Sequence, residues 1–316
     1  MGNPSYFHMA QSDEKNEPLV SVVVITYNSA KTVGETLDSI KAQTYQNLEL
    51  IVSDDCSKDN TLEIVSAWLK ENEQSFKSVA MLTSDMNKGV AANINKGICA
   101  SKGEWVKSIA GDDLLTNDAI CEYVSFVLNH PDCRICLAML DVFGAPKDVL
   151  DKRNFHLNDI YSELKSHDRL GLYSIALVKH ILPGPGIFYQ KSLWEEIGGF
   201  DEDYSMAEEW PFELRVLSVT SVMLLEKKIV RWRQSLGSLS NNKESMNYIQ
   251  DRLIYKNIRR KRLMADFRFF DVMECDLQYK YKATGKWYYK GLRFLLPHLV
   301  VRRLIRLINI KLNNLL

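Results

Sequence analysis

The sequence has few cysteines and no long apolar run. Its six cysteines are scattered over 316 residues without a paired framework, which favours a reducing compartment over a disulfide-bonded secreted protein. A run of about 18 uncharged apolar residues, the length of a membrane-spanning helix, does not occur. Residues 1–17 are polar and lack the apolar stretch of a secretory signal, so we expect them to form a flexible leader.

The chain also lacks net charge of either sign, because 40 Lys plus Arg balance 40 Asp plus Glu. This balance excludes a uniformly basic protein, and we expect no nucleic-acid partner. The charges are nevertheless segregated. Residues 1–251 hold 24 basic and 36 acidic side chains, whereas residues 252–316 hold 16 basic and 4 acidic. The neutral total therefore joins an acidic body to a basic C-terminal segment.

The first half of the chain alternates two hydrophobic periods. Near-continuous apolar runs predict strands that are buried on both faces, at Leu19–Thr26, Leu48–Ser53, Ser78–Thr83 and Glu104–Ala110. The segments between these runs carry apolar residues at helical spacing. This alternation predicts an α/β fold with a mostly parallel central sheet flanked by helices, and we assign it to residues 18–240.

The second half is predicted in less detail. Residues 141–191 look irregular. Pro211 suits the first turn of a helix at Pro211–Thr220. Short strands are expected at Ile187–Gln190, Ser221–Glu226 and Lys228–Arg233. From about residue 243 onward the pattern is helical, so residues 241–316 are expected to form a basic helical C-terminal extension.

Polar side chains follow three of the predicted strands. They are Thr26-Tyr27-Asn28 after the first, Asp54-Asp55 after the second, and Gly111-Asp112-Asp113 after the fourth. Parallel sheets bind ligands outside the carboxyl ends of their strands, so these groups should meet at one edge. Neither a GxGxxG fingerprint nor a Walker A loop occurs in the chain. The carboxylates therefore favour a phosphate ligand bound through a metal ion.

Taken in order, these motifs resemble those of a known family. Residues 18–61 (PLVSVVVITYNSAKTVGETLDSIKAQTYQNLELIVSDDCSKDNT) are similar to the opening of the family 2 glycosyltransferases, which have the GT-A fold. The other motifs follow in the family's order: Asn87-Lys88-Gly89-Val90, Lys102-Gly103-Glu104-Trp105, Gly111-Asp112-Asp113, Gly198-Gly199-Phe200-Asp201 and Glu208-Glu209-Trp210-Pro211. The resemblance implies inverting transfer of a sugar from a nucleotide diphosphate sugar, in particular a UDP-sugar, to a hydroxyl of a glycan or lipid-linked glycan. It also implies a bacterial role in surface polysaccharide assembly, such as that of O-antigen or capsule.

The resemblance further implies roles for single residues. Asp113 would be the principal ligand of a Mn²⁺ or Mg²⁺ ion, and Asp112 would contact the ribose or share the metal. Asp55 would accept a hydrogen bond from the uracil edge. The rest of the nucleotide pocket would be lined by Thr26, Tyr27 and Asn28, with the ring of Tyr27 available for stacking. The plainer alternative is that the aspartates only shape turns, where Asp is common.

An inverting transfer needs a base that takes the proton of the acceptor hydroxyl. By the resemblance this base is the second acid of an acidic pair, which is Glu209 here, with Glu208 as the alternative. Both are expected just before a helix N-terminus, where the helix dipole favours a carboxylate. The other interpretation is that they are two solvated acids at a helix start.

Two positions depart from the family pattern. Ala110 stands where many members have an aspartate, and Ser235 stands where many have the histidine of an Arg-x-His motif. Arg231 or Arg233 would supply positive charge to the diphosphate instead, unless both are ordinary exposed arginines of a strand edge. These departures keep a non-catalytic scaffold, or a nucleotide-binding membrane-associated protein, open as alternatives. A nucleotidyltransferase would need a glycine- and lysine-rich first loop, which this chain lacks.

Residues 286–316 carry seven basic and no acidic side chains. Their leucines and isoleucines form an apolar stripe flanked by Arg302, Arg303 and Arg306, and a basic amphipathic helix is typical of binding to an anionic membrane surface. The alternative is a helical bundle packed on the main domain, with its charges solvated. We expect a cytoplasmic protein bound peripherally to the inner face of the cell membrane. The sequence leaves the oligomeric state, the sugar and the acceptor open.

Overall fold

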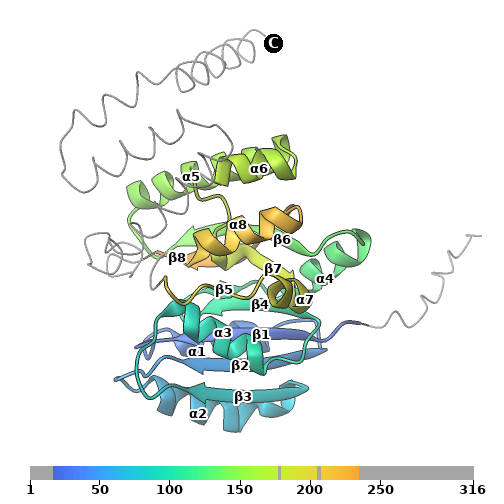
Figure 1. Cartoon of the computed structure of the whole chain (residues 1–316). Helices are drawn as coiled ribbons and strands as arrows, with labels where there is room; N and C mark the ends of the chain where they lie inside the picture. Colours follow the sequence, from blue (N-terminus) through green and yellow to red (C-terminus); the bar gives the residue numbers. More distant parts are fainter. Residues whose placement is uncertain (1–16, 177–178, 205–207, 235–316) are drawn as a thin grey trace, which may run out of the picture.

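One mixed β-sheet runs through the molecule and is surrounded by helices (Figure 1). The structure is a computed structural model and describes residues 17–176, 179–204 and 208–234. Eight strands lie in the order β3-β2-β1-β4-β7-β6-β8-β5. They are β1 (Val20–Thr26), β2 (Leu48–Asp54), β3 (Ser78–Thr83), β4 (Trp105–Ala110), β5 (Leu114–Leu115), β6 (Ile135–Phe143), β7 (Ile187–Gln190) and β8 (Met223–Arg233).

Strands β3, β2, β1 and β4 pair in parallel and form one half of the sheet. Strand β2 is buried along its full length and β1 along nearly all of it, as expected of strands covered on both faces. Helix α3 (Val90–Ala100) packs on both strands at Gly97, where a Cβ atom would lie 2.4 Å from Val23 Cγ1. The bounds of these four strands agree with the predicted ones to within one residue.

The other half of the sheet reverses direction at β7. Strand β7 is antiparallel to both β4 and β6, and β6 is parallel to β8. Strands β4, β6 and β8 therefore run in the same direction, and their carboxyl ends share one edge of the sheet with those of β1 and β2. The segment before β7 reaches this same edge because β7 runs the opposite way.

The prediction that residues 141–191 are irregular is wrong. Residues 147–176 form two helices, α5 (Lys147–Ser166) and α6 (Arg169–Ala176). The apolar stripe of α5 lies only in its second half, at Leu157, Ile160, Tyr161 and Leu164. The polar first half hides the helical period in the sequence. Likewise, the two strands predicted after residue 220 are one strand, β8, whose register against β6 shifts around Met139.

The remaining helices surround the sheet, with α5 and α6 at the end of the molecule opposite β3 (Figure 1). The helices not yet named are α1 (Val33–Lys41), α2 (Thr61–Asn72), α4 (Ala119–Asn129), α7 (Lys191–Glu196) and α8 (Glu209–Val219), with the short 3-10 helices η1 (Glu73–Ser75) and η2 (Gly184–Gly186). Helix α8 begins two residues before the predicted start at Pro211. Glu208 is its cap and Glu209 its first residue, so Glu209 lies inside the helix rather than before it.

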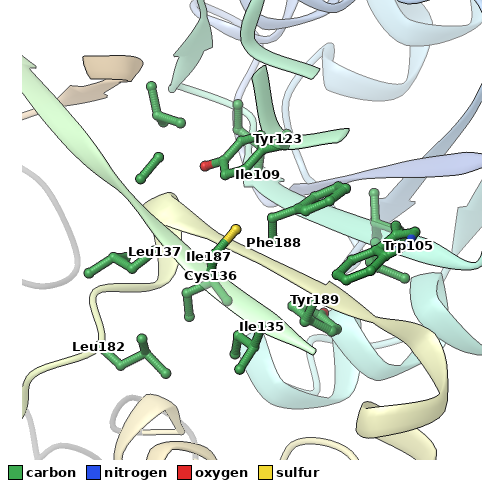
Figure 2. Close-up of a cluster of buried hydrophobic side chains, with 14 of the residues drawn as sticks. Trp105, Ile109, Tyr123, Ile135, Cys136, Leu137, Leu182, Ile187, Phe188 and Tyr189 are labelled. Carbon is green, nitrogen blue, oxygen red and sulfur yellow. The ribbon is translucent and has the colours of Figure 1, made fainter. Parts of the chain in front are cut away.

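Aromatic rings join the two halves of the sheet (Figure 2). Phe188 of β7 stacks on Trp105 of β4, with ring centroids 5.1 Å apart, and on Tyr123 of α4, with centroids 4.7 Å apart. Such pairs contribute about 0.5–1.5 kcal/mol each beyond the area that they bury. The hydroxyl of Tyr123 also donates to the carbonyl of Gly186 at 2.8 Å. The core thus fixes the η2 segment, which reaches the carboxyl edge of the sheet.

The structure leaves some predictions untested. Within the described ranges, no helix is long and apolar enough to cross a membrane. The predicted extension at residues 241–316, including the basic residues 286–316, lies outside the described residues, as does the leader apart from residue 17. The domain division at residue 240 therefore stays a prediction.

Candidate active site

The loops that follow β1 and β2 are tied together at the carboxyl edge of the sheet. Asn28 adopts a left-handed backbone conformation with φ of 53°, and its backbone N–H donates to Ser57 Oγ at 2.8 Å. The backbone N–H of Lys58 donates in turn to Asn28 Oδ1 at 2.7 Å. Asn tolerates positive φ better than most residues. Asn28 therefore links the two loops that would hold a nucleotide.

Thr26 and Tyr27 have different surroundings. Thr26 is buried, and its hydroxyl donates to Asp54 Oδ1 at 2.8 Å, so it supports the loop from within. Tyr27 is 39% exposed, which leaves its ring available for stacking on a base. Of these two residues predicted for the pocket, Tyr27 is the one that presents its side chain to solvent.

Asp55 holds the segment that leads into α3. Its buried carboxylate accepts hydrogen bonds from the backbone N–H groups of Lys88 at 2.9 Å and Gly89 at 2.8 Å. Gly89 has φ of 91°, a conformation that favours glycine. These contacts explain why the Asn87-Lys88-Gly89-Val90 motif accompanies Asp55. A carboxylate has about four lone-pair sites, so the contact of Asp55 with a base edge stays a prediction.

The Gly111-Asp112-Asp113 motif leaves β4 close to the loop after β1. The N–H of Gly111 donates to the carbonyl of Ile25 at 2.9 Å, and its carbonyl accepts the hydroxyl of Thr32 at 2.7 Å. A Cβ atom at position 111 would lie 2.9 Å from Thr26 Cγ2. Glycine therefore permits this close approach, which brings the two aspartates to the nucleotide loops.

Burial outweighs the nearby positive charges at the two aspartates. Asp113 is 2% exposed and accepts the backbone N–H of Arg233 at 2.8 Å. Burial, and then the charge of Asp112, raise the pKa of Asp113 to about 8, against the opposing effects of Arg233 and Lys107. Burial also raises the pKa of Asp112, and Arg233 opposes that rise. A divalent cation would favour the ionised form of both carboxylates.

Carboxylate oxygens are the donors that Mg²⁺ and Mn²⁺ prefer. In the part of the chain that the structure describes, no group of three or more His, Cys, Asp or Glu residues is placed to hold a metal ion. Asp112 and Asp113 alone would leave most coordination positions to water and to phosphate oxygens, as is usual for Mg²⁺. The residues present therefore fit a metal ion that binds together with a diphosphate.

Arg233 contacts the aspartate motif, whereas Arg231 lies farther out. Arg233 Nε donates to the carbonyl of Asp112 at 2.7 Å, and its Nη2 lies 2.6 Å from Glu35 Oε2. The side chain of Arg233 is only 20% exposed. Arg231 is 44% exposed, with Nε 3.5 Å from Asp141 Oδ2. Arg231 is thus exposed but does not lie at a strand edge, because β8 pairs with β5 and with β6 at this residue. The description of an exposed arginine is wrong for Arg233.

Lys107 is a residue of this region that the sequence interpretation missed. Its ammonium group is buried and donates to the carbonyl oxygens of Pro185 at 2.7 Å and Ser108 at 2.5 Å. Burial lowers the pKa of Lys107 to about 7, and the charge of Asp113 opposes this effect. The available signal was a lysine inside an otherwise largely apolar strand, because a buried charge needs a partner.

The acidic pair starts α8, and its two members differ in exposure. Glu209 Oε1 accepts the backbone N–H of Gly184 at 2.9 Å, and Oε2 lies 3.0 Å from His180 Nε2. The Glu209 side chain is 36% exposed, whereas Glu208 is buried. Glu209 is therefore the more accessible acid.

The η2 segment connects the acids to the aspartates. The backbone N–H of Gly184 in this segment donates to Glu209. The carbonyl oxygen of the next residue, Pro185, accepts a hydrogen bond from the ammonium group of Lys107, and the charge of Lys107 acts on Asp113. These contacts run from Glu209 to Lys107, so residues that are far apart in sequence lie together near the carboxyl edge of the sheet. Such an edge is where sheets of this kind bind their ligands.

The chain is similar to known proteins over most of its length. The glycosyl transferase family 2 profile matches residues 21–198, which is more than half of the chain. The chain is also 26% identical over 229 residues to a PGL/p-HBAD biosynthesis glycosyltransferase of Mycobacterium bovis, covering 71% of this chain and 80% of that protein. The share of the relative's own length that the chain spans varies, from 25% of a Sinorhizobium fredii protein to 80% of the M. bovis protein.

Two solved structures share the fold. Staphylococcus aureus TarS 1–349 in complex with UDP-GlcNAc has a TM-score of 0.59 at 19% identity, covering 83% of this chain and 72% of that one. The mannosyltransferase PcManGT from Pyrobaculum calidifontis, in complex with GDP-Man and Mn²⁺, has a TM-score of 0.56 at 18% identity, covering 93% and 88%. The chain therefore belongs to glycosyl transferase family 2 and is a glycosyltransferase with the GT-A fold.

Proposed function

We propose that this enzyme transfers a sugar from a UDP-sugar to a hydroxyl of a glycan or lipid-linked glycan, with inversion at the anomeric carbon. One observation carries the proposal. Asp112 and Asp113 adjoin the loop after β1, and Lys107, whose charge acts on Asp113, is hydrogen-bonded to the η2 segment that holds the exposed carboxylate of Glu209. A site of this kind offers a place for a diphosphate and a base for an incoming hydroxyl.

The nucleotide would lie along the loops after β1 and β2. The exposed ring of Tyr27 offers a stacking surface, and Asn28 holds the two loops together. Asp55 would receive a hydrogen bond from the base edge beside the N-terminus of α3. TarS, a neighbour in fold, is known in complex with UDP-GlcNAc, which supports a uridine nucleotide. PcManGT was solved with GDP-Man, so a test of the donor has to include guanosine nucleotides.

Asp113 and Asp112 would hold a Mn²⁺ or Mg²⁺ ion, and the raised pKa of each carboxyl supports this assignment. When bound, the ion supplies positive charge to the diphosphate leaving group. Arg233 would add a fixed positive charge beside the same group, because its guanidinium is anchored to the carbonyl of Asp112 and to Glu35. Charge that is already oriented stabilises a leaving group at little reorganisation cost.

Glu209 would act as the base. It would take the proton of the acceptor hydroxyl as that oxygen attacks the anomeric carbon from the face opposite the diphosphate. The new glycosidic bond forms while the bond to the diphosphate oxygen breaks, which inverts the configuration at the anomeric carbon. The exposure of Glu209 and its fixed contact with Gly184 support this role over Glu208.

The acceptor would be a glycan or lipid-linked glycan of a bacterial surface polysaccharide or glycolipid. The M. bovis relative is described as a glycosyltransferase of PGL/p-HBAD biosynthesis, which supports a cell-envelope product. The basic residues 286–316 would hold the enzyme on an anionic membrane surface. This places the proposed reaction at the cytoplasmic face of the cell membrane, where a lipid-linked acceptor is within reach.

A donor screen tests the proposal. The full-length protein is incubated with a panel of UDP-, GDP- and dTDP-sugars, with Mn²⁺ or with EDTA, and release of the nucleoside diphosphate is measured. We expect Mn²⁺-dependent release from a UDP-sugar, and its loss in Asp113→Asn. UDP with Mn²⁺ should also raise the Tm more than UDP alone, because the ion and the diphosphate bind together.

The outcomes separate the alternatives. Release from a GDP-sugar instead would keep the transferase and change the nucleotide. Equal Tm shifts with and without Mn²⁺ would contradict the metal site. No release from any donor, together with no Tm shift by UDP, would favour a non-catalytic scaffold of the same fold.

A further inference from the structure

Glu213 is a buried carboxylate one turn beyond Glu209 on α8. It is 1% exposed, and residues four apart lie on the same face of a helix. A buried carboxylate is costly unless a positive group accompanies it. The transfer reaction proposed above makes no direct use of Glu213, so its retention inside the protein calls for a partner.

His180 is that partner and lies between the two acids. Its Nδ1 is 2.6 Å from Glu213 Oε2, and its Nε2 is 3.0 Å from Glu209 Oε2. The first contact is a hydrogen bond, whereas the second is an ion pair whose angle falls outside hydrogen-bond geometry. Glu213 also accepts the backbone N–H of Ile181 at 3.1 Å, which fixes the carboxylate against the chain next to His180.

The charges of the three side chains are coupled. Burial lowers the pKa of His180, but the carboxylates of Glu213 and Glu209 together outweigh burial and raise it to about 10. Burial raises the pKa of Glu213, and His180 opposes that rise. The imidazole is therefore protonated at neutral pH, and it presents a positive charge to Glu209 at 3.0 Å.

Other cations near the cluster have partners of their own. Lys179 pairs with Asp159 at 2.6 Å. Arg153 of α5 donates to Gln234 Oε1 at 3.2 Å, although its charge also acts on Glu209. Burial and the surrounding cations lower the pKa of the nearby His156, which disfavours a positive charge there. Among the residues that the structure describes, the one cation within ion-pair distance of Glu209 is His180.

We propose that His180 and Glu213 are positioning residues for the base, an inference that rests on the proposed role of Glu209. Glu213 holds the imidazolium through Nδ1, and the imidazolium places its positive charge beside Glu209, with Nε2 3.0 Å from Oε2. The N–H of Gly184 fixes the other oxygen of Glu209. Lone pairs remain on the carboxylate for the acceptor proton. After transfer that proton resides on Glu209, and His180 stays protonated throughout.

The first test needs no substrate. The full-length protein is labelled at histidine, and NMR of the ring nitrogens gives the pKa of His180. The His180 signal is identified as the one that is missing from the spectrum of His180→Gln. We expect titration near pH 10 in the wild type and at a lower pH in Glu213→Gln, because one carboxylate that stabilises the imidazolium is lost. Lys179→Gln, which removes a charge next to His180, should leave that titration near the wild-type value. A wild-type titration near 6.5, the ordinary value, would overturn the proposal.

The second test is the pH dependence of transfer. We expect His180→Gln to lower kcat at least about tenfold, a part of the roughly 10²–10⁴-fold that a general base contributes, while the donor KM stays near wild type. The wild-type profile should lose activity as His180 titrates near pH 10, and this step should be absent from His180→Gln, because the amide has no proton to lose in that range. Lys179→Gln should leave both the profile and kcat unchanged.

The outcomes separate this inference from the proposed function. A His180→Gln enzyme with the wild-type kcat and pH profile would overturn the positioning role and leave the transfer reaction intact. If the wild type releases nucleoside diphosphate from no donor, the proposed function fails, and the positioning role fails with it whatever the titration shows.

Discussion

Glu208 and Glu209 are neighbours in sequence, yet the fold gives them different surroundings. Glu208 caps α8 and is buried, whereas Glu209 is the first helical residue and keeps 36% of its side chain exposed. The acceptor hydroxyl must come within hydrogen-bond reach of the base. Exposure therefore favours the acid that the resemblance had also placed first.

Replacing Glu209 with Gln should abolish transfer, with a loss of roughly 10²–10⁴-fold in kcat, because the amide keeps the shape of the side chain but cannot take a proton. The affinity for UDP with Mn²⁺, measured by calorimetry, should stay near wild type. Glu208→Gln makes the same chemical change one residue earlier and serves as the matched control. A dead Glu208→Gln beside an active Glu209→Gln would reverse the assignment of the base.

The charge at the aspartate motif is supplied differently from what the family pattern suggests. By the resemblance, Ala110 and Ser235 stand where many members have an aspartate and a histidine, and Ser235 lies outside the described residues. Arg233 reaches the carbonyl of Asp112 with its side chain and the carboxylate of Asp113 with its backbone N–H. One residue at the end of β8 thus supports both aspartates, and the site keeps a fixed cation despite the missing histidine.

Among the elements, the η2 segment contacts the proposed base directly, through the backbone N–H of Gly184. A Cβ atom on Gly184 would lie 2.2 Å from Glu209 Oε1. Gly184→Ala should therefore displace the carboxylate and lower kcat at least about tenfold, within the contribution of a general base. The fold should survive because the clash is with the end of a flexible side chain. Steady-state kinetics and a thermal melt measure the two effects.

Gly34→Ala is the control for this substitution. Nothing lies within 4 Å of a Cβ atom at Gly34, which belongs to α1. It should keep full activity, and stability should rise by about 0.5–1 kcal/mol, because Ala loses less conformational freedom than Gly in a helix. Full kcat in Gly184→Ala would mean that the contact with Gly184 does not position the base.

The parallel half of the sheet could be predicted from the sequence because strands buried on both faces give unbroken apolar runs. The site residues at their carboxyl ends followed from that prediction. Helices α5 and α6 were missed, and for α5 the reason is that its buried residues lie only in its second half, so the helix gives no apolar period along its full length. The pairing of β7 with both β4 and β6 is non-local, and a short apolar run does not reveal its partners.

The contacts of His180, Glu213 and Lys107 were not predicted either, because they join residues far apart in sequence. His180 and Glu213 are 33 residues apart and meet only because the segment after α6 returns to α8. Lys107 gave a signal of its own, since it interrupts an apolar strand, but its partner Pro185 lies 78 residues away. Tertiary contacts of this range have no local pattern, whereas motifs at strand ends do.

At the scale of the whole molecule, the neutral charge is the sum of two blocks of opposite sign. The acidic block, residues 1–251, contains the aspartates and glutamates of the site and would receive a diphosphate through a cation. The basic block, residues 252–316, has the sign that suits an anionic surface. This separation predicts that membrane binding and nucleotide binding can be altered independently.

Replacing Arg302, Arg303 and Arg306 together with Gln should release the full-length enzyme from vesicles that contain anionic lipid. Each basic side chain near such a surface contributes about 1 kcal/mol, so the three together account for roughly 100-fold in affinity. Wild-type binding, measured by vesicle sedimentation, should weaken as salt rises, because screening shortens the reach of the charges. Hydrolysis of the donor in solution should be unchanged.

The same change at Arg259, Arg260 and Arg262 removes equal charge away from the apolar stripe and should weaken binding less. Equal losses in the two triple variants would mean that net charge alone, and not an amphipathic segment, holds the enzyme at the membrane.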